Sequence, residues 1–214
     1  MRKTLLLALL AALVFIVAGV AVLAVALTQE KRPPPEELFS ETSSIVATAT
    51  PETSPTPEPE PVSSAPVVRA QIPSIGVDAK IVILGVDPDG TMQVPKGPKD
   101  VAWYTFSAHP GAVGNVVLAG HVDYVNYGAA VFWHLRDLKP GDDVVLTLDD
   151  GLKYTYRISS SVAYDDATAP VAEIVGPTPT ETITLITCTG TFDRRAREYD
   201  KRLVVKGYRV RDAP

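Results

Sequence analysis

The sequence of 214 residues contains one cysteine, Cys188, and no excess of positive charge. A single cysteine excludes an intramolecular disulfide, so a domain working outside the cytoplasm would be held together by its core alone. The formal net charge is −5 at pH 7, which gives no global support for nucleic acid binding. No pair among the three histidines has metal-ligand spacing, and one cysteine cannot build a zinc cluster. We therefore expect no metal site and no cofactor.

Charged residues are absent from residues 5–27, which consist of Leu, Ala, Val, Ile, Phe and Gly. A run of this length can cross a bilayer as a helix, which takes about 20 residues. A cleaved secretory signal is the alternative, because Ala24-Val25-Ala26 is a possible cleavage site, but signal cores span only roughly 7–15 apolar residues. We predict that residues 1–32 form an uncleaved membrane anchor with basic flanks, with the following residues outside the cell.

Lysine and arginine are absent from residues 33–66, which are rich in Pro, Ser, Thr and Glu. Apolar residues are too sparse there to bury a core, and the prolines favour extended polyproline geometry. We predict that residues 33–66 form a disordered stalk that holds a domain away from the membrane.

Helical periodicity is scarce in residues 67–214, where short β-branched and apolar runs alternate with turn residues. This pattern predicts an all-β domain, either a barrel or a sandwich. Strands are expected at residues 68–73, 79–84, 115–121, 143–148, 152–159, 182–188 and 203–210, with 162–164 continuing the sheet. Residues 129–135 are expected to form a short helix.

Cys188 ends the predicted strand 182–188, and Gly190 follows where the backbone is expected to turn. A thiol at the end of a strand is held rigidly and can still face solvent, which suits a nucleophile. The alternative is that Cys188 is a small buried apolar residue, since free cysteine is among the most buried residue types. A nucleophilic thiol needs a base or a positive neighbour, because its ordinary pKa is about 8.5.

His121 is the best candidate for that base, because it also lies at the end of a predicted strand. His134 stands beside Trp133 in an apolar segment and is interpreted as a packed histidine. His109 precedes a Pro-Gly pair and is expected at the surface. Strand ends that meet at one rim of a barrel would bring His121 and Cys188 together.

Arg202 is a candidate oxyanion donor, because it stands where the last strand is expected to begin. Its guanidinium is planar and permanently charged, which suits the binding of a developing negative charge. An antiparallel return from Cys188 would place Arg202 beside the thiol. The rest of the basic segment 194–202 is expected to be a solvated loop.

The combination of these motifs resembles the sortases, which are membrane-anchored cysteine transpeptidases of mainly Gram-positive bacteria. The resemblance covers residues 67–210 and is greatest to class F sortases. It is carried by Ala119-Gly120-His121-Val122-Asp123, Ala130-Val131-Phe132, Leu138-Lys139-Pro140-Gly141-Asp142, Ile186-Thr187-Cys188-Thr189-Gly190-Thr191-Phe192-Asp193 and Arg202.

The resemblance implies an eight-stranded β-barrel that cleaves the Thr–Gly bond of an LPXTG-type sorting signal. Cys188 would form the thioacyl intermediate, His121 would be the general acid and base, and Arg202 would stabilise substrate and oxyanion. Thr187 would help to bind the signal. The implied partners are secreted proteins with such a signal and an amine acceptor of the peptidoglycan.

Two other functions remain open from the residues themselves. One is an extracytoplasmic cysteine peptidase, and the other is a membrane-tethered β-domain that binds a partner without catalysis. The arginine also has an alternative, since Arg197 lies near Arg202 in the same basic segment.

Overall fold

The computed structural model describes residues 63–211. The predicted anchor at residues 1–32 and residues 33–62 of the predicted stalk lie outside this range. Among the described residues, none of the helices combines the length and the hydropathy needed to span a bilayer.

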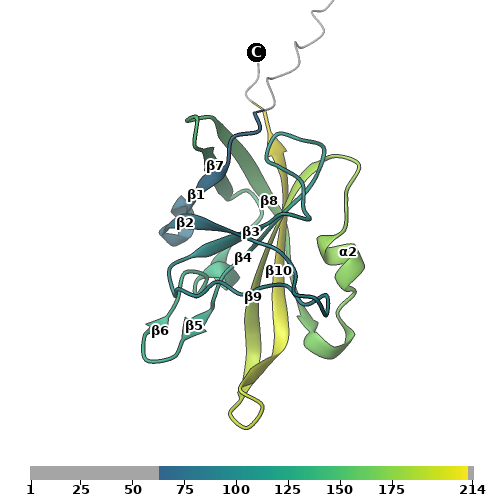
Figure 1. Ribbon diagram of the computed structural model, residues 1–214. Coiled ribbons are helices and arrows are strands. Elements are labelled where there is room, and N and C mark those ends of the chain that lie inside the picture. Colours follow the sequence, from purple (N-terminus) through teal and green to yellow (C-terminus); the bar gives the residue numbers. More distant parts are fainter. Residues whose placement is uncertain (1–62, 212–214) are drawn as a thin grey trace, which may run out of the picture. The chain divides into compact units, whose positions relative to one another are not determined.

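Eight strands close into a barrel in the order β1-β2-β3-β4-β9-β10-β8-β7 (Figure 1). Their bounds are β1 (Val67–Ile72), β2 (Val77–Leu84), β3 (Val101–Tyr104), β4 (Gly114–Ala119), β7 (Asp143–Leu148), β8 (Lys153–Asp165), β9 (Glu181–Asp193) and β10 (Glu198–Val210). The pairs β2–β3 and β4–β9 are parallel, and the remaining neighbours in the barrel are antiparallel. The predicted all-β barrel is therefore confirmed.

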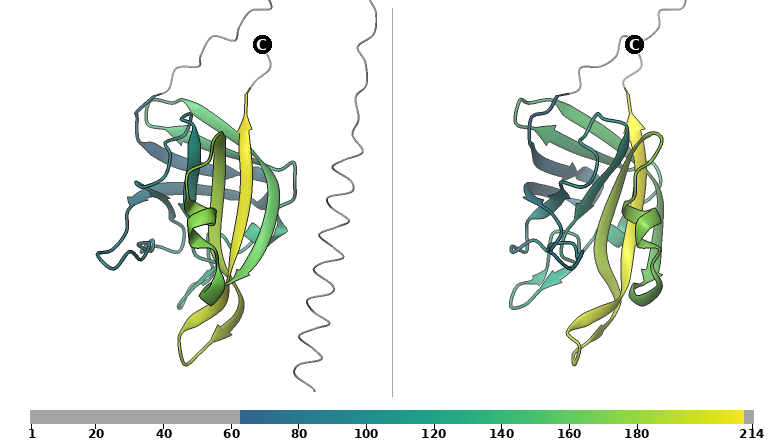
Figure 2. Two further views of the ribbon diagram at one scale, coloured as in Figure 1. Left: turned by 90° about the vertical axis from the view of Figure 1, so that its right-hand side faces the viewer. Right: turned by 45° about the vertical axis from the view of Figure 1, so that its right-hand side comes forward.

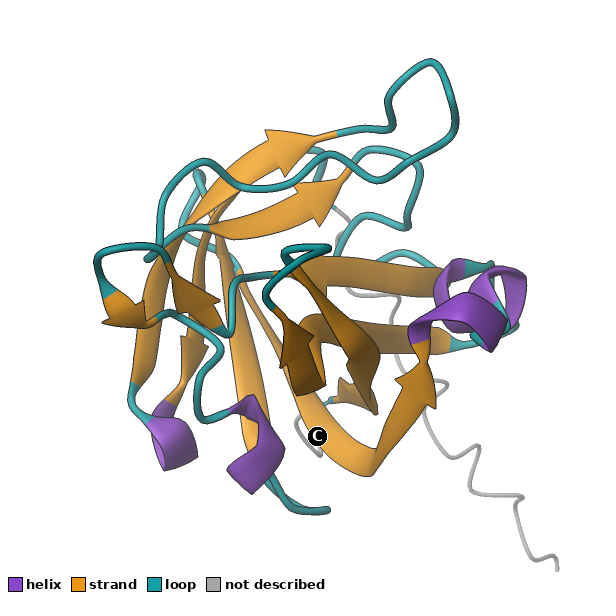
Figure 3. Cartoon of the chain, turned by 90° about the horizontal axis from the view of Figure 1, so that it is seen from below, coloured by secondary structure: helices purple, strands orange, loops and turns teal. Residues whose placement is uncertain are grey.

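One short β-hairpin and several short helices connect the strands of the barrel (Figure 3). They are the hairpin β5 (Asp123–Tyr124) and β6 (Gly128–Ala129), the 3₁₀ helices η1 (Pro73–Ile75), η2 (Leu135–Asp137) and η3 (Asp166–Thr168), and the helix α2 (Val171–Val175). The helix predicted at residues 129–135 is wrong, because Ala129 ends β6 and η2 starts only at Leu135. Phe132 is buried in the core, and its backbone N–H donates to the His121 carbonyl, so the segment is a turn that supports His121.

Alternating residues of β7 and β8 build the barrel core. Val144, Leu146 and Leu148 of β7 are buried while their neighbours are half-buried. On β8, Tyr154 and Tyr156 are buried and share one face, as the alternation in the sequence predicts.

Burial raises the pKa of Tyr104 of β3 to about 12, so this phenol remains a neutral donor to the Gln93 carbonyl.

A second apolar cluster lies on the outer face of β3 and β4. It consists of Ala102, Tyr104 and Val117, with Val175 of α2 and Ile186 of β9 packed against it. The inner face of β4 contributes Val116 and Leu118 to the main core. Covering both faces of β4 explains why its sequence is continuously apolar rather than alternating.

Both strands of the β9–β10 hairpin are longer than predicted. β9 continues beyond Cys188 to Asp193, and β10 already begins at Glu198. Gly190 has a φ of 86° and accompanies a shift of register between the two strands, so it marks an irregularity within the hairpin rather than the end of a strand. The hairpin consequently projects beyond the barrel (Figure 2).

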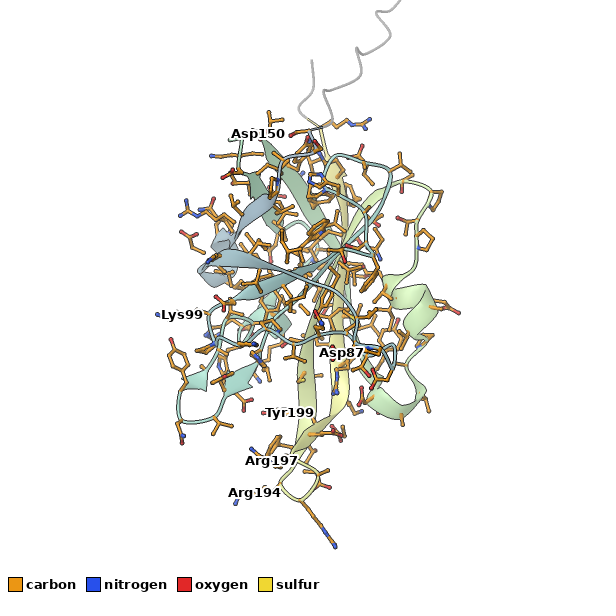
Figure 4. The ribbon with its side chains drawn as sticks, viewed as in Figure 1. Asp87, Lys99, Asp150, Arg194, Arg197 and Tyr199 are labelled. Carbon is orange, nitrogen blue, oxygen red and sulfur yellow. The ribbon has the colours of Figure 1, made fainter. Side chains whose placement is uncertain are left out.

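The hairpin tip and the ends of the described chain lie at opposite ends of the barrel. Figure 4 shows Arg194 and Arg197 at one end and Asp150, in the turn between β7 and β8, at the other. The Ser63 hydroxyl donates to the Asp150 carboxylate, and Arg211 pairs with Glu181 at the start of β9.

Replacing Gly207 by Ala should destabilise the barrel. A β-carbon there would lie 2.5 Å from the Arg157 carbonyl oxygen of β8, and backbone cannot move aside as a side-chain tip can. We expect the free energy of unfolding to fall by about 1–3 kcal/mol in a urea titration.

Gly85→Ala is the matched control for this substitution. Its β-carbon would meet nothing closer than 3.7 Å, and we expect a change of less than about 1 kcal/mol. Equal losses from both substitutions would contradict the packing argument.

Candidate active site

The parallel pairing of β4 with β9 brings His121 near Cys188. Ala119 and Ile186 are the last paired residues of the two strands, and the Gly120 N–H extends the ladder to the Ile186 carbonyl at 3.2 Å. His121 and Cys188 each follow this pair by two residues on strands that lie about 4.8 Å apart. The sequence separates the two residues widely, and the register of the sheet brings them together.

Antiparallel pairing places Arg202 on the other side of the thiol. Arg202 of β10 is the direct partner of Cys188 of β9. Leu203 of β10 and Leu185 of β9 point into the core, so by alternation Arg202 and Cys188 face outward. The alternative that Cys188 is a buried apolar residue of the core is therefore wrong, and Cys188 is half-buried at the barrel surface.

One cleft with a volume of about 550 Å³ unites the predicted residues. Its lining includes His121, Cys188 and Arg202, which come from the end of β4, from β9 and from β10. The remaining lining residues are Val122, Asp123, Tyr124, Val125, Phe192, Arg197, Glu198 and Tyr199. The cleft thus lies between the β5–β6 hairpin and the base of the β9–β10 hairpin.

The imidazole of His121 is oriented by two contacts. Its Nε2 lies 2.7 Å from the Pro95 carbonyl oxygen, and its ring meets the Tyr124 ring edge-on at 5.1 Å. A carbonyl can only accept a hydrogen bond, so Nε2 must carry the proton. In the neutral ring, Nδ1 is then the nitrogen that can accept a proton.

Thr187 supports the peptide that precedes His121. Its side chain is buried, and its hydroxyl donates to the Gly120 carbonyl at 2.8 Å. A β-carbon on Gly120 would lie 2.8 Å from both Val131 and Phe132, so only glycine fits there without movement of its neighbours. Thr187 does not line the cleft, and its observed contact holds the β4 end against β9.

Burial raises the pKa of the Cys188 thiol above its ordinary value. The positive charge of Arg202 acts in the opposite direction, whereas Asp166, Asp123 and Glu198 raise the pKa further. The Cys188 sulfur has no hydrogen-bond partner within residues 63–211. The Cys188 thiol is therefore protonated at neutral pH, and a base would be needed to convert it to a nucleophile.

The Arg202 guanidinium is held by three hydrogen bonds. Nη1 donates to the Tyr199 carbonyl at 2.9 Å and to the Lys201 carbonyl at 3.2 Å, and Nη2 donates to Asp166 Oδ2 at 3.0 Å. A guanidinium has five N–H groups. In the described part of the chain, the Nε–H and one Nη2–H of Arg202 have no partner, so two donors remain for a ligand.

Arg197 also lines the cleft, from the turn between β9 and β10. Its backbone is left-handed, with φ of 61°, and its N–H donates to the Asp193 carbonyl at 2.7 Å. The Arg197 side chain is exposed and forms no hydrogen bond or ion pair with another described residue. Both arginines can thus reach the cleft, but only Arg202 is fixed beside the thiol.

The environments predicted for the other two histidines are wrong. His134 is exposed and pairs with Asp137 at 2.8 Å, because the turn that buries Phe132 and Leu135 directs it outward. His109 is half-buried, with its Nε2 2.8 Å from the Ala65 carbonyl oxygen and its ring against Trp103. Within residues 63–211, no three His, Cys, Asp or Glu side chains are grouped so as to hold a metal ion.

Sequence reasoning missed a hydrogen bond that joins the two walls of the cleft. The Tyr199 hydroxyl of β10 donates to Asp123 Oδ2 of β5 at 2.6 Å. Burial and then the Asp123 carboxylate raise the pKa of Tyr199 to about 12, so the phenol keeps its proton at neutral pH. The only feature of the sequence that pointed to this contact is the position of Asp123, two residues after His121.

Comparison with protein families decides the family of this chain. The sequence model of the sortase domain matches residues 70–210. The chain belongs to the sortase family. Comparison with curated proteins finds no match.

Solved sortase structures have the same fold. A lid mutant of sortase A from Corynebacterium diphtheriae is 26% identical, with 71% of this chain and 74% of that chain covered and a TM-score of 0.54. Sortase C-1 from Actinomyces oris is 26% identical, with 68% and 75% covered and a TM-score of 0.53. Sortase A from Listeria monocytogenes is 24% identical, with 69% and 88% covered and a TM-score of 0.52, and supports the fold alone.

Family membership makes this protein a cysteine transpeptidase, and Cys188 is the only cysteine in its sequence. The similar structures include sortases of classes A, C and D. They do not single out class F, to which the sequence motifs are most similar.

The rate at which iodoacetamide alkylates Cys188 should rise with pH along a curve whose midpoint lies above the ordinary thiol pKa of about 8.5. Burial is the main cause, because it disfavours the thiolate. Alkylation is followed by mass spectrometry and reports on Cys188 alone, since the chain has no other cysteine.

Arg202→Gln serves as the internal comparison. Removing the positive charge that favours the thiolate should move the midpoint to still higher pH. A midpoint below the ordinary thiol value, or one that falls in Arg202→Gln, would contradict this account of the site.

Proposed function

We propose that this sortase cleaves the Thr–Gly bond of an LPXTG-type sorting signal and transfers the threonyl group to an amine of the cell wall. The observation that carries the proposal is the convergence of Cys188, His121 and Arg202 on one cleft. The register on both sides of β9 supports this assignment, because it sets an imidazole and a guanidinium on either side of one thiol.

The first half-reaction acylates Cys188. His121 Nδ1 accepts the thiol proton while the sulfur attacks the threonyl carbonyl carbon, and the oxyanion that forms accepts hydrogen bonds from the two unused donors of Arg202. The C–N bond then breaks. The departing glycine amine takes the proton from the imidazolium, which leaves a thioester and a neutral His121.

The second half-reaction releases the product. An acceptor amine attacks the thioester carbonyl, passes a proton to His121, and forms a new amide bond. The C–S bond breaks, and the sulfur recovers the proton as the thiol. Water in place of the amine would give hydrolysis by the same steps.

The proposal also covers where the protein is located and to which sortase class it belongs. We assign residues 1–32 to a membrane anchor, 33–66 to a stalk and 67–214 to the catalytic domain on the outside of the cell, with class F as the subclass. The uncharged run in residues 5–27 supports the anchor, and the motifs around His121 and Cys188 support the class. In addition, Thr187 would contribute to binding of the sorting signal by fixing the peptide before His121.

Cys188→Ala should abolish cleavage of a fluorogenic LPXTG-type peptide, and His121→Ala should lower the rate by about 10²–10⁴-fold. The first change removes the atom that carries the acyl group, and the second removes its proton carrier. His134→Ala is the matched control, because His134 is exposed and pairs with Asp137 away from the cleft lining. Full activity of Cys188→Ala would overturn the assignment.

Product analysis with an added amine separates the remaining functions. Formation of the amide between the threonyl group and the amine supports a transpeptidase, whereas hydrolysis alone favours a peptidase. A domain that only binds a partner would give neither product.

Arg202→Lys should reduce the cleavage rate by about 10²–10³-fold, the usual loss when an oxyanion donor is removed. An ammonium cannot reproduce the planar fork that sits between the Asp166 contact and the cleft. Arg197→Ala should have a smaller effect, because that side chain has no fixed position beside the thiol. The reverse ranking of the two variants would move the role to Arg197.

A further inference from the structure

Asp166 is the first residue of η3, and the sheet delivers it to Arg202. β8 ends at Asp165 and pairs with β10, so that Tyr164 is opposite Arg202 and Asp165 is opposite Lys201. The chain then turns into η3, and Asp166 Oδ2 accepts from Arg202 Nη2 at 3.0 Å. Asp166 does not line the cleft, so its influence on the reaction passes through Arg202.

Within residues 63–211, this contact is the only hydrogen bond or ion pair that the guanidinium makes outside its own strand. The other two acceptors are carbonyls of β10 itself, at Tyr199 and Lys201, and both bind Nη1. These two bonds hold only one end of the guanidinium, at Nη1. Asp166 holds the other end, at Nη2, and within residues 63–211 the Nε–H and one Nη2–H stay unused.

We propose that Asp166 is a positioning residue, which orients Arg202 so that its two unused donors meet the acyl oxygen of the substrate. The proposal rests on the proposed role of Arg202 in the reaction. Arg202 is partly buried and Asp166 is half-exposed, so the charge attraction of the pair contributes little to stability. The ion pair acts instead by fixing the position of the Arg202 guanidinium, because misplacing a catalytic group by about 1 Å can lower the rate about 10²-fold.

The same carboxylate also affects the thiol. Charged and titratable groups face Cys188 from each neighbouring element: Arg202, Glu198 and Tyr199 from β10, His121 and Asp123 from the segment after β4, Arg197 from the hairpin turn, and Asp166 from η3. Asp166 raises the pKa of Cys188 and so opposes Arg202. It helps to keep the resting thiol protonated, a form that oxidants attack slowly.

Three variants test the proposal. Asp166→Ala removes both the acceptor and the charge, Asp166→Asn retains an acceptor oxygen without the charge, and Asp165→Asn is the matched control. Asp165 is adjacent, carries the same charge and pairs with Lys201 Nζ at 3.2 Å instead of with Arg202.

We expect Asp166→Ala to lower kcat for the LPXTG-type peptide by up to about 100-fold with little change in KM, because the lost interaction acts in the transition state. Asp166→Asn should keep more of the parent's kcat than Asp166→Ala. Both should be alkylated by iodoacetamide faster than the parent at neutral pH. Asp165→Asn should match the parent in kcat.

Combining Asp166→Ala with Arg202→Lys distinguishes positioning from general support of the fold. If Asp166 acts through Arg202, the double variant loses no more activity than Arg202→Lys alone. Additive losses, a parental kcat in Asp166→Ala, or an equal loss in Asp165→Asn would overturn the positioning role. A fully active Arg202→Lys would instead overturn the proposed role of Arg202 itself.

Discussion

The placement of β9 between β4 and β10 is the constraint on which the site depends. β4 runs parallel to β9 and ends two residues before His121. β10 runs antiparallel to β9 and sets Arg202 opposite Cys188. A slip of one residue in either pairing would turn an alternate side chain outward, and Thr187 or Leu203 would replace the functional residue. The apolar inner face of these strands fixes the register, so packing of the core and geometry of the site have one cause.

Positive and negative charges both lie near the Cys188 thiol, and they shift its pKa in opposite directions. Arg202 is the cation that favours the thiolate, and its own ion pair with Asp166 offsets part of that effect. Asp123 is engaged by the Tyr199 hydroxyl, which leaves Glu198 as a further carboxylate in the cleft. In the proposed mechanism, Cys188 therefore rests as a thiol and becomes a nucleophile only when His121 removes its proton. This division of roles agrees with an imidazole whose Nε2 is committed to the Pro95 carbonyl.

The strands and the three central residues could be predicted because their signals are local. The run from Asp143 to Leu148 is rich in β-branched and apolar residues between two turn signals, and it is a strand with those bounds. His121 and Cys188 stand where apolar runs give way to polar residues. The convergence of the two at one cleft is confirmed by the structure. Their catalytic roles and the role of Arg202 stay predictions.

What the sequence could not provide depends on tertiary contacts. The Asp166 and Tyr199 interactions join elements that are distant along the chain, and neither residue has a local pattern that marks it. The environments of His109 and His134 were reversed for the same reason, since the apolar neighbours of His134 turn inward and leave the imidazole in solvent. The extension of β9 beyond Cys188 was missed because a glycine that usually ends a strand is accommodated here by a shift of register.

The parallel pairing of β4 with β9 also bears on the order of folding. Parallel neighbours require a long crossover, and in this chain β5, β6, β7, β8 and α2 intervene between the two strands. Contacts that close such long loops form late and slowly, because the chain loses conformational entropy on loop closure before the new contacts stabilise it. A newly made chain therefore carries an ordinary, unassisted cysteine until its barrel closes, and acyl transfer becomes possible only in the completed protein.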